Sequence, residues 1–172
     1  MHSIRLMLIM LLVLALCLPA VGTAETQQDL IGTQMPDFTV TAIDDQTFTL
    51  SKVLQEKELV LINIFATWCG PCAMEFPFME EAYQRYQDKV AVIALSLEQK
   101  DDAEALTAYA AEHGITFHVA NDGETNLAYY FMVQAIPTTV LVDRTGTIVY
   151  LGVGAMPDVD GFTQLFDRFL GQ

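Results

Sequence analysis

Three nearly continuous apolar runs stand out in the chain after its N-terminal segment. They occupy residues 59–65, 90–97 and 138–142 and contain no charged side chain. A strand that is covered on both faces of a sheet has this pattern, whereas a strand with one face in water alternates apolar and polar residues. The runs therefore predict the central strands of a sheet with a layer on each side.

Shorter segments precede and follow these runs. Residues 38–43 and 47–50 alternate apolar and polar positions around the polar residues 44–46. This pattern predicts an N-terminal hairpin. Near the other end of the chain, the turn residues 143–146 and the segment 147–151 follow the third apolar run, which predicts a second hairpin.

Helical segments separate the predicted strands. Helical spacing and the residues that start and stop helices predict a short helical turn at 51–54 and helices at 71–87, 101–113, 124–131 and 159–170. A short strand is expected at 116–120. Strands that alternate with helices favour an α/β fold, in which right-handed crossovers make the first strands parallel. The final hairpin must be antiparallel, so we expect a central mixed sheet flanked by helices on both faces.

The N-terminal segment differs in composition from the rest. Residues 6–18 are almost all apolar, Arg5 precedes them, and small residues follow. This order predicts a secretory signal peptide over residues 1–24, cut after Ala24 or, alternatively, after Ala20. An uncleaved membrane anchor is the other interpretation, although the apolar stretch is marginally short for a membrane span.

The remaining composition indicates one strongly acidic domain. Residues 25–34 are polar and have no period, so we expect a tether followed by a single domain over residues 35–172. The chain of 172 residues has 8 Lys and Arg against 22 Asp and Glu, a net charge of −14. This charge argues against nucleic acid and anionic membrane surfaces as partners. Loss of the signal would remove Cys17 and leave two cysteines, too few for a disulfide scaffold.

Those two cysteines form the most informative motif of the chain. Cys69 and Cys72 directly follow the first apolar run, and Pro71 suits the first turn of the next helix. Unpaired N–H groups and the helix dipole stabilise a thiolate at such a position. We expect Cys69 to attack a disulfide and the more shielded Cys72 to resolve the mixed disulfide. An inert disulfide and half of a zinc site are the alternatives, although no second ligand pair has zinc spacing.

Glu75 follows Cys72 by three residues, so the two side chains share one face of the predicted helix. If the carboxylate is buried, its pKa rises and it can accept the Cys72 proton during resolution. The alternative is a solvated glutamate that interacts favourably with the helix dipole.

The residues Ile136, Pro137 and Thr138 stand just before and at the start of the third apolar run. With a cis bond between Ile136 and Pro137, the Ile136 backbone could pair with an extended peptide substrate. Trp68 is interpreted as an exposed contact surface beside Cys69, with core packing as the alternative. These residues are the candidate substrate-binding site.

Together these motifs resemble the active site of the thioredoxin superfamily. Residues 68–72 match its Trp-Cys-Gly-Pro-Cys motif, and residues 136–138 match the cis-proline loop that lies opposite. The N-terminal hairpin, Glu75 and an extra helix between the second and third core strands resemble the TlpA/ResA-like oxidoreductases. The resemblance implies a thioredoxin-like fold with these two additions and a functional role for Glu75. Asn63 stands where thioredoxins carry a buried Asp.

The same resemblance implies an activity and its partners. It implies that a monomer reduces protein disulfides outside the cytoplasm of a bacterium, in the periplasm or tethered to the membrane. Apocytochrome c is an implied substrate, and a membrane thiol protein an implied electron donor. The redox-active Cys69–Cys72 pair would be the only redox group, without a cofactor or a metal. Gly70 and Pro71 resemble the reducing thioredoxins, whose potential is about −270 mV.

Two other groups with this fold are less similar. Peroxiredoxins have a Thr three residues before the reactive Cys and a Pro seven residues before it. This chain has Ala66 and Ile62 at these positions. Copper chaperones of the Sco type use a wider cysteine spacing and a His ligand. A copper-binding chaperone remains the leading alternative outside enzymes.

Overall fold

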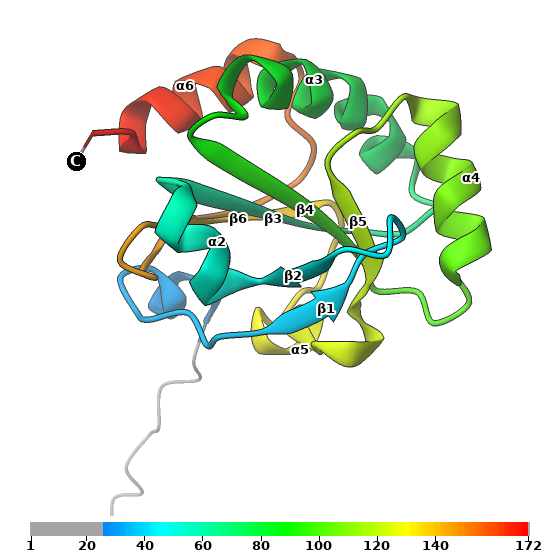
Figure 1. Ribbon diagram of the computed structural model, residues 1–172, viewed down its shortest axis with the longest axis horizontal. Helices are drawn as coiled ribbons and strands as arrows, with labels where there is room; N and C mark the ends of the chain where they lie inside the picture. Colours follow the sequence, from blue (N-terminus) through cyan, green and yellow to red (C-terminus); the bar gives the residue numbers. More distant parts are fainter. Residues whose placement is uncertain (1–25, 172) are drawn as a thin grey trace, which may run out of the picture.

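A five-stranded mixed sheet is the centre of the computed structural model, which describes residues 26–171 (Figure 1). The strands are β3 (Leu59–Phe65), β4 (Val90–Ser96), β5 (His118–Asn121), β6 (Thr138–Asp143) and β7 (Ile148–Val153). They lie in the order β5-β4-β3-β6-β7, in which β3, β4 and β5 are parallel and β6 and β7 are antiparallel to their neighbours. The α/β class and the mixed sheet predicted from the sequence are confirmed.

Three helices cover one face of this sheet (Figure 1). They are α3 (Gly70–Tyr86), α4 (Ala103–His113) and α6 (Val159–Phe169). Their buried side chains form one core with residues of β3 and β4, where the rings of Phe65 and Phe76 meet edge to face at 5.0 Å. This packing holds α3, and with it the cysteine motif, directly on the sheet.

The opposite face is covered by smaller elements (Figure 1). They are the hairpin of β1 (Thr39–Thr41) and β2 (Thr47–Thr49), with α2 (Leu50–Glu56) and α5 (Leu127–Tyr130). Successive residues of a strand point to opposite faces, so β3 supplies both cores. Leu61 and Phe65 pack on the three long helices, whereas Ile62 and Ile64 pack on this side. That division explains why the apolar runs have no polar alternation.

The segment predicted as a single helix over residues 124–131 is divided. The structure has a 3-10 turn, η2 (Asp122–Glu124), and then the short helix α5. The carboxylate of Asp122 accepts a hydrogen bond from the Leu127 N–H at 2.7 Å, and Asn126 has a left-handed backbone with φ of 54°. The chain therefore starts a new helix at Leu127 instead of continuing one.

The described part of the predicted tether, residues 26–34, is also more ordered than expected. It includes a 3-10 helix, η1 (Gln27–Leu30), and the chain beyond this helix pairs with β7. Gly32 N–H donates to the Ile148 carbonyl at 2.8 Å, and Ile148 N–H donates to the Thr33 carbonyl at 2.9 Å. Because backbone groups make this contact, the side-chain pattern of the segment gave no sign of it.

The signal peptide or anchor predicted for residues 1–24 lies outside the described residues. Within residues 26–171, no helix is both long enough and apolar enough to cross a membrane.

Candidate active site

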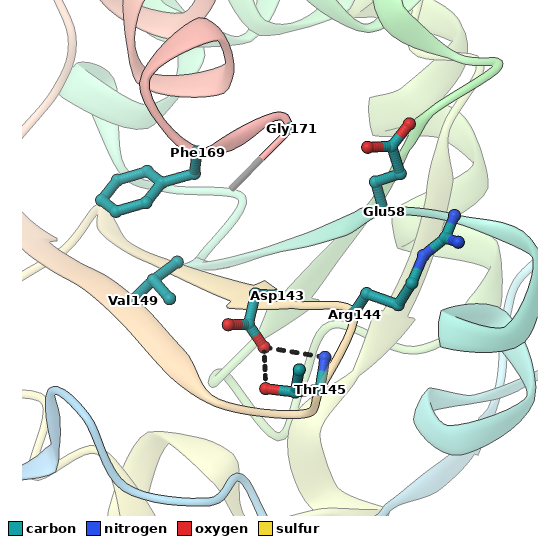
Figure 2. A pocket seen from close by; sticks show the side chains of 7 residues that line it. All are labelled: Glu58, Asp143, Arg144, Thr145, Val149, Phe169 and Gly171. Carbon is teal, nitrogen blue, oxygen red and sulfur yellow. Dashed lines mark hydrogen bonds between the residues drawn. The ribbon is translucent and has the colours of Figure 1, made fainter.

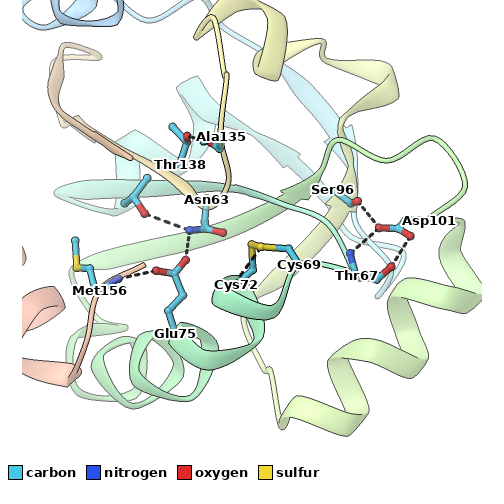
Figure 3. The surroundings of a disulfide bond; sticks show 11 residues. Asn63, Thr67, Cys69, Cys72, Glu75, Ser96, Asp101, Ala135, Thr138 and Met156 are labelled. Atoms are coloured by element: carbon cyan, nitrogen blue, oxygen red, sulfur yellow. Dashed lines mark hydrogen bonds between the residues drawn. A yellow bond between two sulfur atoms is a disulfide. The ribbon is translucent and has the colours of Figure 1, made fainter. Parts of the chain in front are cut away.

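The Cys69–Cys72 disulfide lies at the junction of β3 and α3 (Figure 3). Cys69 is the N-cap of α3, and Pro71 occupies the first turn of the helix. The Cys69 sulfur accepts a hydrogen bond from the Cys72 N–H at 3.2 Å. Cys69 thus faces the unpaired N–H groups at the positive end of α3, which favour a thiolate once the disulfide is reduced.

The residues of the motif differ sharply in exposure. Trp68 is 66% exposed, Cys69 is 4% exposed and Cys72 is completely buried. The Trp68 indole N–H also donates to a Glu98 carboxylate oxygen at 3.3 Å. Trp68 and the edge of Cys69 are therefore accessible from outside the protein, whereas Cys72 is not. This geometry agrees with Trp68 as a surface contact and with Cys72 as the shielded sulfur.

Glu75 has no exposed surface and lies one helical turn after Cys72. Its Oε1 accepts a hydrogen bond from Asn63 Nδ2 at 2.9 Å, and its Oε2 accepts one from the Met156 N–H at 3.0 Å (Figure 3). Burial raises the pKa of Glu75 to about 7, against the opposing effect of the two hydrogen bonds. The alternative of a solvated glutamate is therefore wrong. A group with this pKa can take up and return a proton near neutral pH.

The loop at Ile136 and Pro137 lies at the same end of the sheet as the disulfide. Thr138, the first residue of β6, pairs with Ile64 near the end of β3. The Ile136–Pro137 peptide bond is cis, and the Pro137 carbonyl accepts a hydrogen bond from the Gly154 N–H at 2.8 Å. Pro137 and Thr138 are buried, while Ile136 is partly exposed. The structure thus brings together the two motifs that lie far apart in the sequence.

Asp101 is a residue of this region that the sequence analysis missed. Its nearly buried carboxylate accepts hydrogen bonds from Thr67 N–H at 3.0 Å, Thr67 Oγ1 at 2.7 Å and Ser96 Oγ at 2.5 Å (Figure 3). Thr67 stands two residues before Cys69, so Asp101 ties the end of β4 to the active-site loop. The sequence does contain a signal for this role. Two aspartates stand side by side before α4, and a helix needs one N-cap, which Asp102 supplies, so Asp101 is left for another contact.

Replacing Asp101 with Ala is expected to lower the free energy of unfolding by about 3 kcal/mol, because three donors lose their buried acceptor. Asp102→Ala is the matched control, since it removes only a helix cap, worth about 1 kcal/mol. Urea unfolding of the two oxidised variants measures both effects. Equal losses would mean that the Asp101 contacts add nothing beyond capping.

Other candidate sites lie away from the disulfide. A hollow of about 220 Å³ opens beside Glu58, at the end of β3 opposite to Cys69 (Figure 2). Asp143 in this hollow accepts hydrogen bonds from the N–H and hydroxyl of Thr145, at 2.9 and 2.6 Å, and so serves the turn between β6 and β7. Among residues 26–171, no three His, Cys, Asp or Glu side chains are grouped so that they could hold a metal ion.

The arrangement has one evident chemistry, the making and breaking of the Cys69–Cys72 disulfide. A shielded second sulfur and a buried carboxyl group one turn away complete what this exchange requires. Fold and site together define a thiol–disulfide oxidoreductase of the thioredoxin superfamily.

Comparisons with known proteins agree with this class and narrow it. The family model described as Redoxin matches residues 30–165, and the chain belongs to this family. Its TlpA/ResA-like relatives include the thiol-disulfide oxidoreductase ResA of Bacillus cereus, 31% identical over 170 residues, which cover 93% of this chain and 95% of ResA. The thioredoxin-like protein YneN of Bacillus subtilis is 35% identical over 126 residues, covering 73% of this chain and 72% of YneN.

Solved structures give the same fold. A Chlorobium tepidum protein provisionally named thiol:disulfide interchange protein DsbE superimposes with a TM-score of 0.71 and 27% identity, over 82% of this chain and 98% of that one. StoA from Bacillus subtilis superimposes with a TM-score of 0.63 over 75% of this chain and 95% of its own, and at 20% identity it supports the fold alone.

Proposed function

We propose that this protein reduces disulfides of other proteins outside the cytoplasm, with Cys69 as nucleophile, Cys72 as resolving thiol and Glu75 as proton acceptor. The observation that carries the proposal is the buried Glu75 carboxyl group, whose pKa burial raises to about 7. Cys72 is itself completely buried, so water cannot take its proton directly. A carboxylate on the same helical face is suited to that task.

The proposed reaction consumes one substrate disulfide. The Cys69 thiolate attacks one substrate sulfur, the substrate S–S bond breaks, and the other substrate sulfur leaves as a thiolate that water protonates. Glu75 then takes the Cys72 proton while the Cys72 sulfur attacks Cys69. The mixed disulfide breaks, the second substrate sulfur leaves as a thiolate that water protonates, and the Cys69–Cys72 disulfide forms. The substrate gains two electrons, and an external dithiol must return two electrons to the protein.

The surface around Cys69 suits an extended protein segment. Neither the N–H nor the C=O of Ile136 is hydrogen-bonded to another backbone group in the described part of the chain. The exposed Trp68 and Val153 give apolar contacts near the disulfide and at the end of β7. Backbone pairing with a few side-chain contacts is a common way to hold an extended peptide without strong sequence preference. We therefore propose protein disulfides as the substrate class.

Location and partners are proposed from the sequence and the relatives. The N-terminal pattern of residues 1–24 supports export as a cleaved or anchored protein. The ResA relative is named a thiol-disulfide oxidoreductase. From the resemblance to the TlpA/ResA-like group we further propose a membrane thiol protein as electron donor, apocytochrome c as a substrate and action as a monomer.

The reduction potential of the Cys69–Cys72 couple tests the reducing direction. In defined thiol buffers at neutral pH we expect a value at or below about −250 mV, as for reducing thioredoxins. A value above about −150 mV would assign the protein to the oxidants or isomerases. If the cysteine pair cannot be reduced and reoxidised, it is either a structural disulfide or a metal-binding pair. A copper titration of the reduced protein would distinguish these two cases.

A further inference from the structure

Asn63 lies in the buried interior between Glu75 and the start of β6. Its side chain is completely buried, and its Nδ2 donates to Glu75 Oε1 at 2.9 Å and to Thr139 Oγ1 at 3.2 Å. The other end of the same amide, Oδ1, has no hydrogen-bond partner in the described structure. Buried polar atoms are rarely left unpaired, so this acceptor calls for an explanation.

The hydrogen bonds of Glu75 determine where a proton would be held. Glu75 Oε2 accepts from the Met156 N–H, a backbone group that can only donate. Oε1 faces Asn63, whose amide can offer either a donor or an acceptor, so Oε1 is the oxygen better placed to carry the proton. If Oε1 carries a hydroxyl that points at Asn63, this hydroxyl meets the Asn63 NH₂ group in its present orientation, and both groups are donors.

We propose that the Asn63 amide turns over when Glu75 changes its protonation state, donating to the carboxylate through Nδ2 and accepting from the carboxylic acid through Oδ1. The inference rests on the proposed role of Glu75 as proton acceptor. It makes Asn63 a positioning residue, because it acts on the disulfide only through Glu75.

The surroundings permit the turn. The oxygen and the NH₂ group of an amide have nearly the same shape, so either fits the same space. Oδ1 has no partner to lose where it now points. The Thr139 hydroxyl now accepts from Nδ2, and it can rotate to donate to Oδ1 instead. Both orientations thus have two hydrogen bonds at the end that faces Glu75 and Thr139.

Among the described residues that contact Glu75 or Asn63, no other group titrates near neutral pH in the oxidised protein. Asn63 on β3, Thr139 on β6 and the Met156 N–H do not ionise in this range. Tyr109 of α4 stays neutral, because burial and nearby acidic charges, Glu75 among them, raise its pKa to about 12. Cys72, on the same helix, is held in the disulfide.

The turn matters for reversible proton transfer. A fixed donor at Asn63 would stabilise the carboxylate alone and resist uptake of the Cys72 proton. An amide that turns supplies a hydrogen bond to each state of Glu75. Glu75 can then accept a proton when the protein oxidises and return it when the protein is reduced again.

Nuclear magnetic resonance of the oxidised, isotope-labelled protein tests the inference. The Glu75 carboxyl carbon reports its protonation, and cross-relaxation between the Asn63 NH₂ protons and the Glu75 side chain reports the amide orientation, both followed from about pH 5 to 9. We expect the Asn63–Glu75 cross-peaks to be strong at high pH and to weaken at least severalfold at low pH, with the midpoint of the Glu75 titration.

Glu75→Gln provides the matched control. The Met156 N–H selects the oxygen of the introduced amide, so the NH₂ group of that amide faces Asn63 as the carboxylic acid would. The variant should hold Asn63 turned at every pH. Cross-peaks that stay constant while Glu75 titrates would overturn the turning amide and leave the proton acceptor intact. A Glu75 carboxyl group that does not titrate in this range would overturn both.

Discussion

Replacing Cys69 with Ser is expected to lower disulfide reduction by at least about three orders of magnitude, because the attacking thiolate is lost. Cys72→Ser is expected to behave differently. It keeps the attacking sulfur but cannot resolve, so it should accumulate a mixed disulfide with the substrate. Insulin reduction measures the loss of turnover, and mass spectrometry after acid quenching identifies the trapped adduct.

The two variants control for each other. Each removes the same Cys69–Cys72 disulfide and leaves one sulfur, so the loss of the cross-link is shared by both. They differ in which sulfur remains, the partly accessible Cys69 or the completely buried Cys72. Trapping by Cys69→Ser in place of Cys72→Ser would reverse the assigned roles. Equal activity in both variants and the wild type would refute a role for the pair.

Replacing Glu75 with Gln is expected to stabilise the oxidised protein at alkaline pH. The pKa of Glu75 lies near 4.5 without its burial and at about 7 in the folded protein, so the folded state binds more protons between these values. Its contribution to stability is complete below about pH 4.5 and is lost as pH rises through about 7. A shift of this size corresponds to roughly 3 kcal/mol, a loss that the uncharged amide of the variant would avoid.

The measurement is urea unfolding of both oxidised proteins from about pH 5 to 8.5. Other groups titrate equally in the two proteins, so the difference between the curves isolates Glu75. The difference in free energy of unfolding should grow in favour of Glu75→Gln as pH rises. The variant should also resolve the mixed disulfide more slowly than the wild type. Parallel curves would show that the Glu75 carboxyl group does not titrate with a raised pKa. A stabilising change that slows catalysis is expected where a site holds a buried charge for function.

Several features of the site could be foreseen from short-range signals. The apolar run of β3, Pro71 and the cysteine spacing were enough to place Cys69 at a helix N-terminus. The spacing of Cys72 and Glu75 was enough to place both on one helical face. These relations depend on residues that are close in the sequence, where the geometry of a helix leaves little choice.

The contacts that could not be foreseen join residues that are distant in the sequence. Glu75 depends on Asn63, twelve residues earlier, and on Met156, 81 residues later. Whether its carboxylate is buried is decided by those partners and by the helix packing above the sheet. Asp101 likewise reaches Thr67 across 34 residues. Polar groups of this kind have no periodic pattern, so only the folded arrangement shows which of them meet.

The position of β3 in the middle of the sheet has a consequence for the lifetime of the active site. β3 has a hydrogen-bonded neighbour on each side, and all of its residues are buried, whereas β5 and β7 are the outer strands. Local opening in proteins starts where few contacts hold the backbone, at edges and ends of the chain. Opening that begins at the ends of the outer strands would therefore leave the cysteine pair on its support. The protein can thus loosen at its periphery and keep its reactive centre in register.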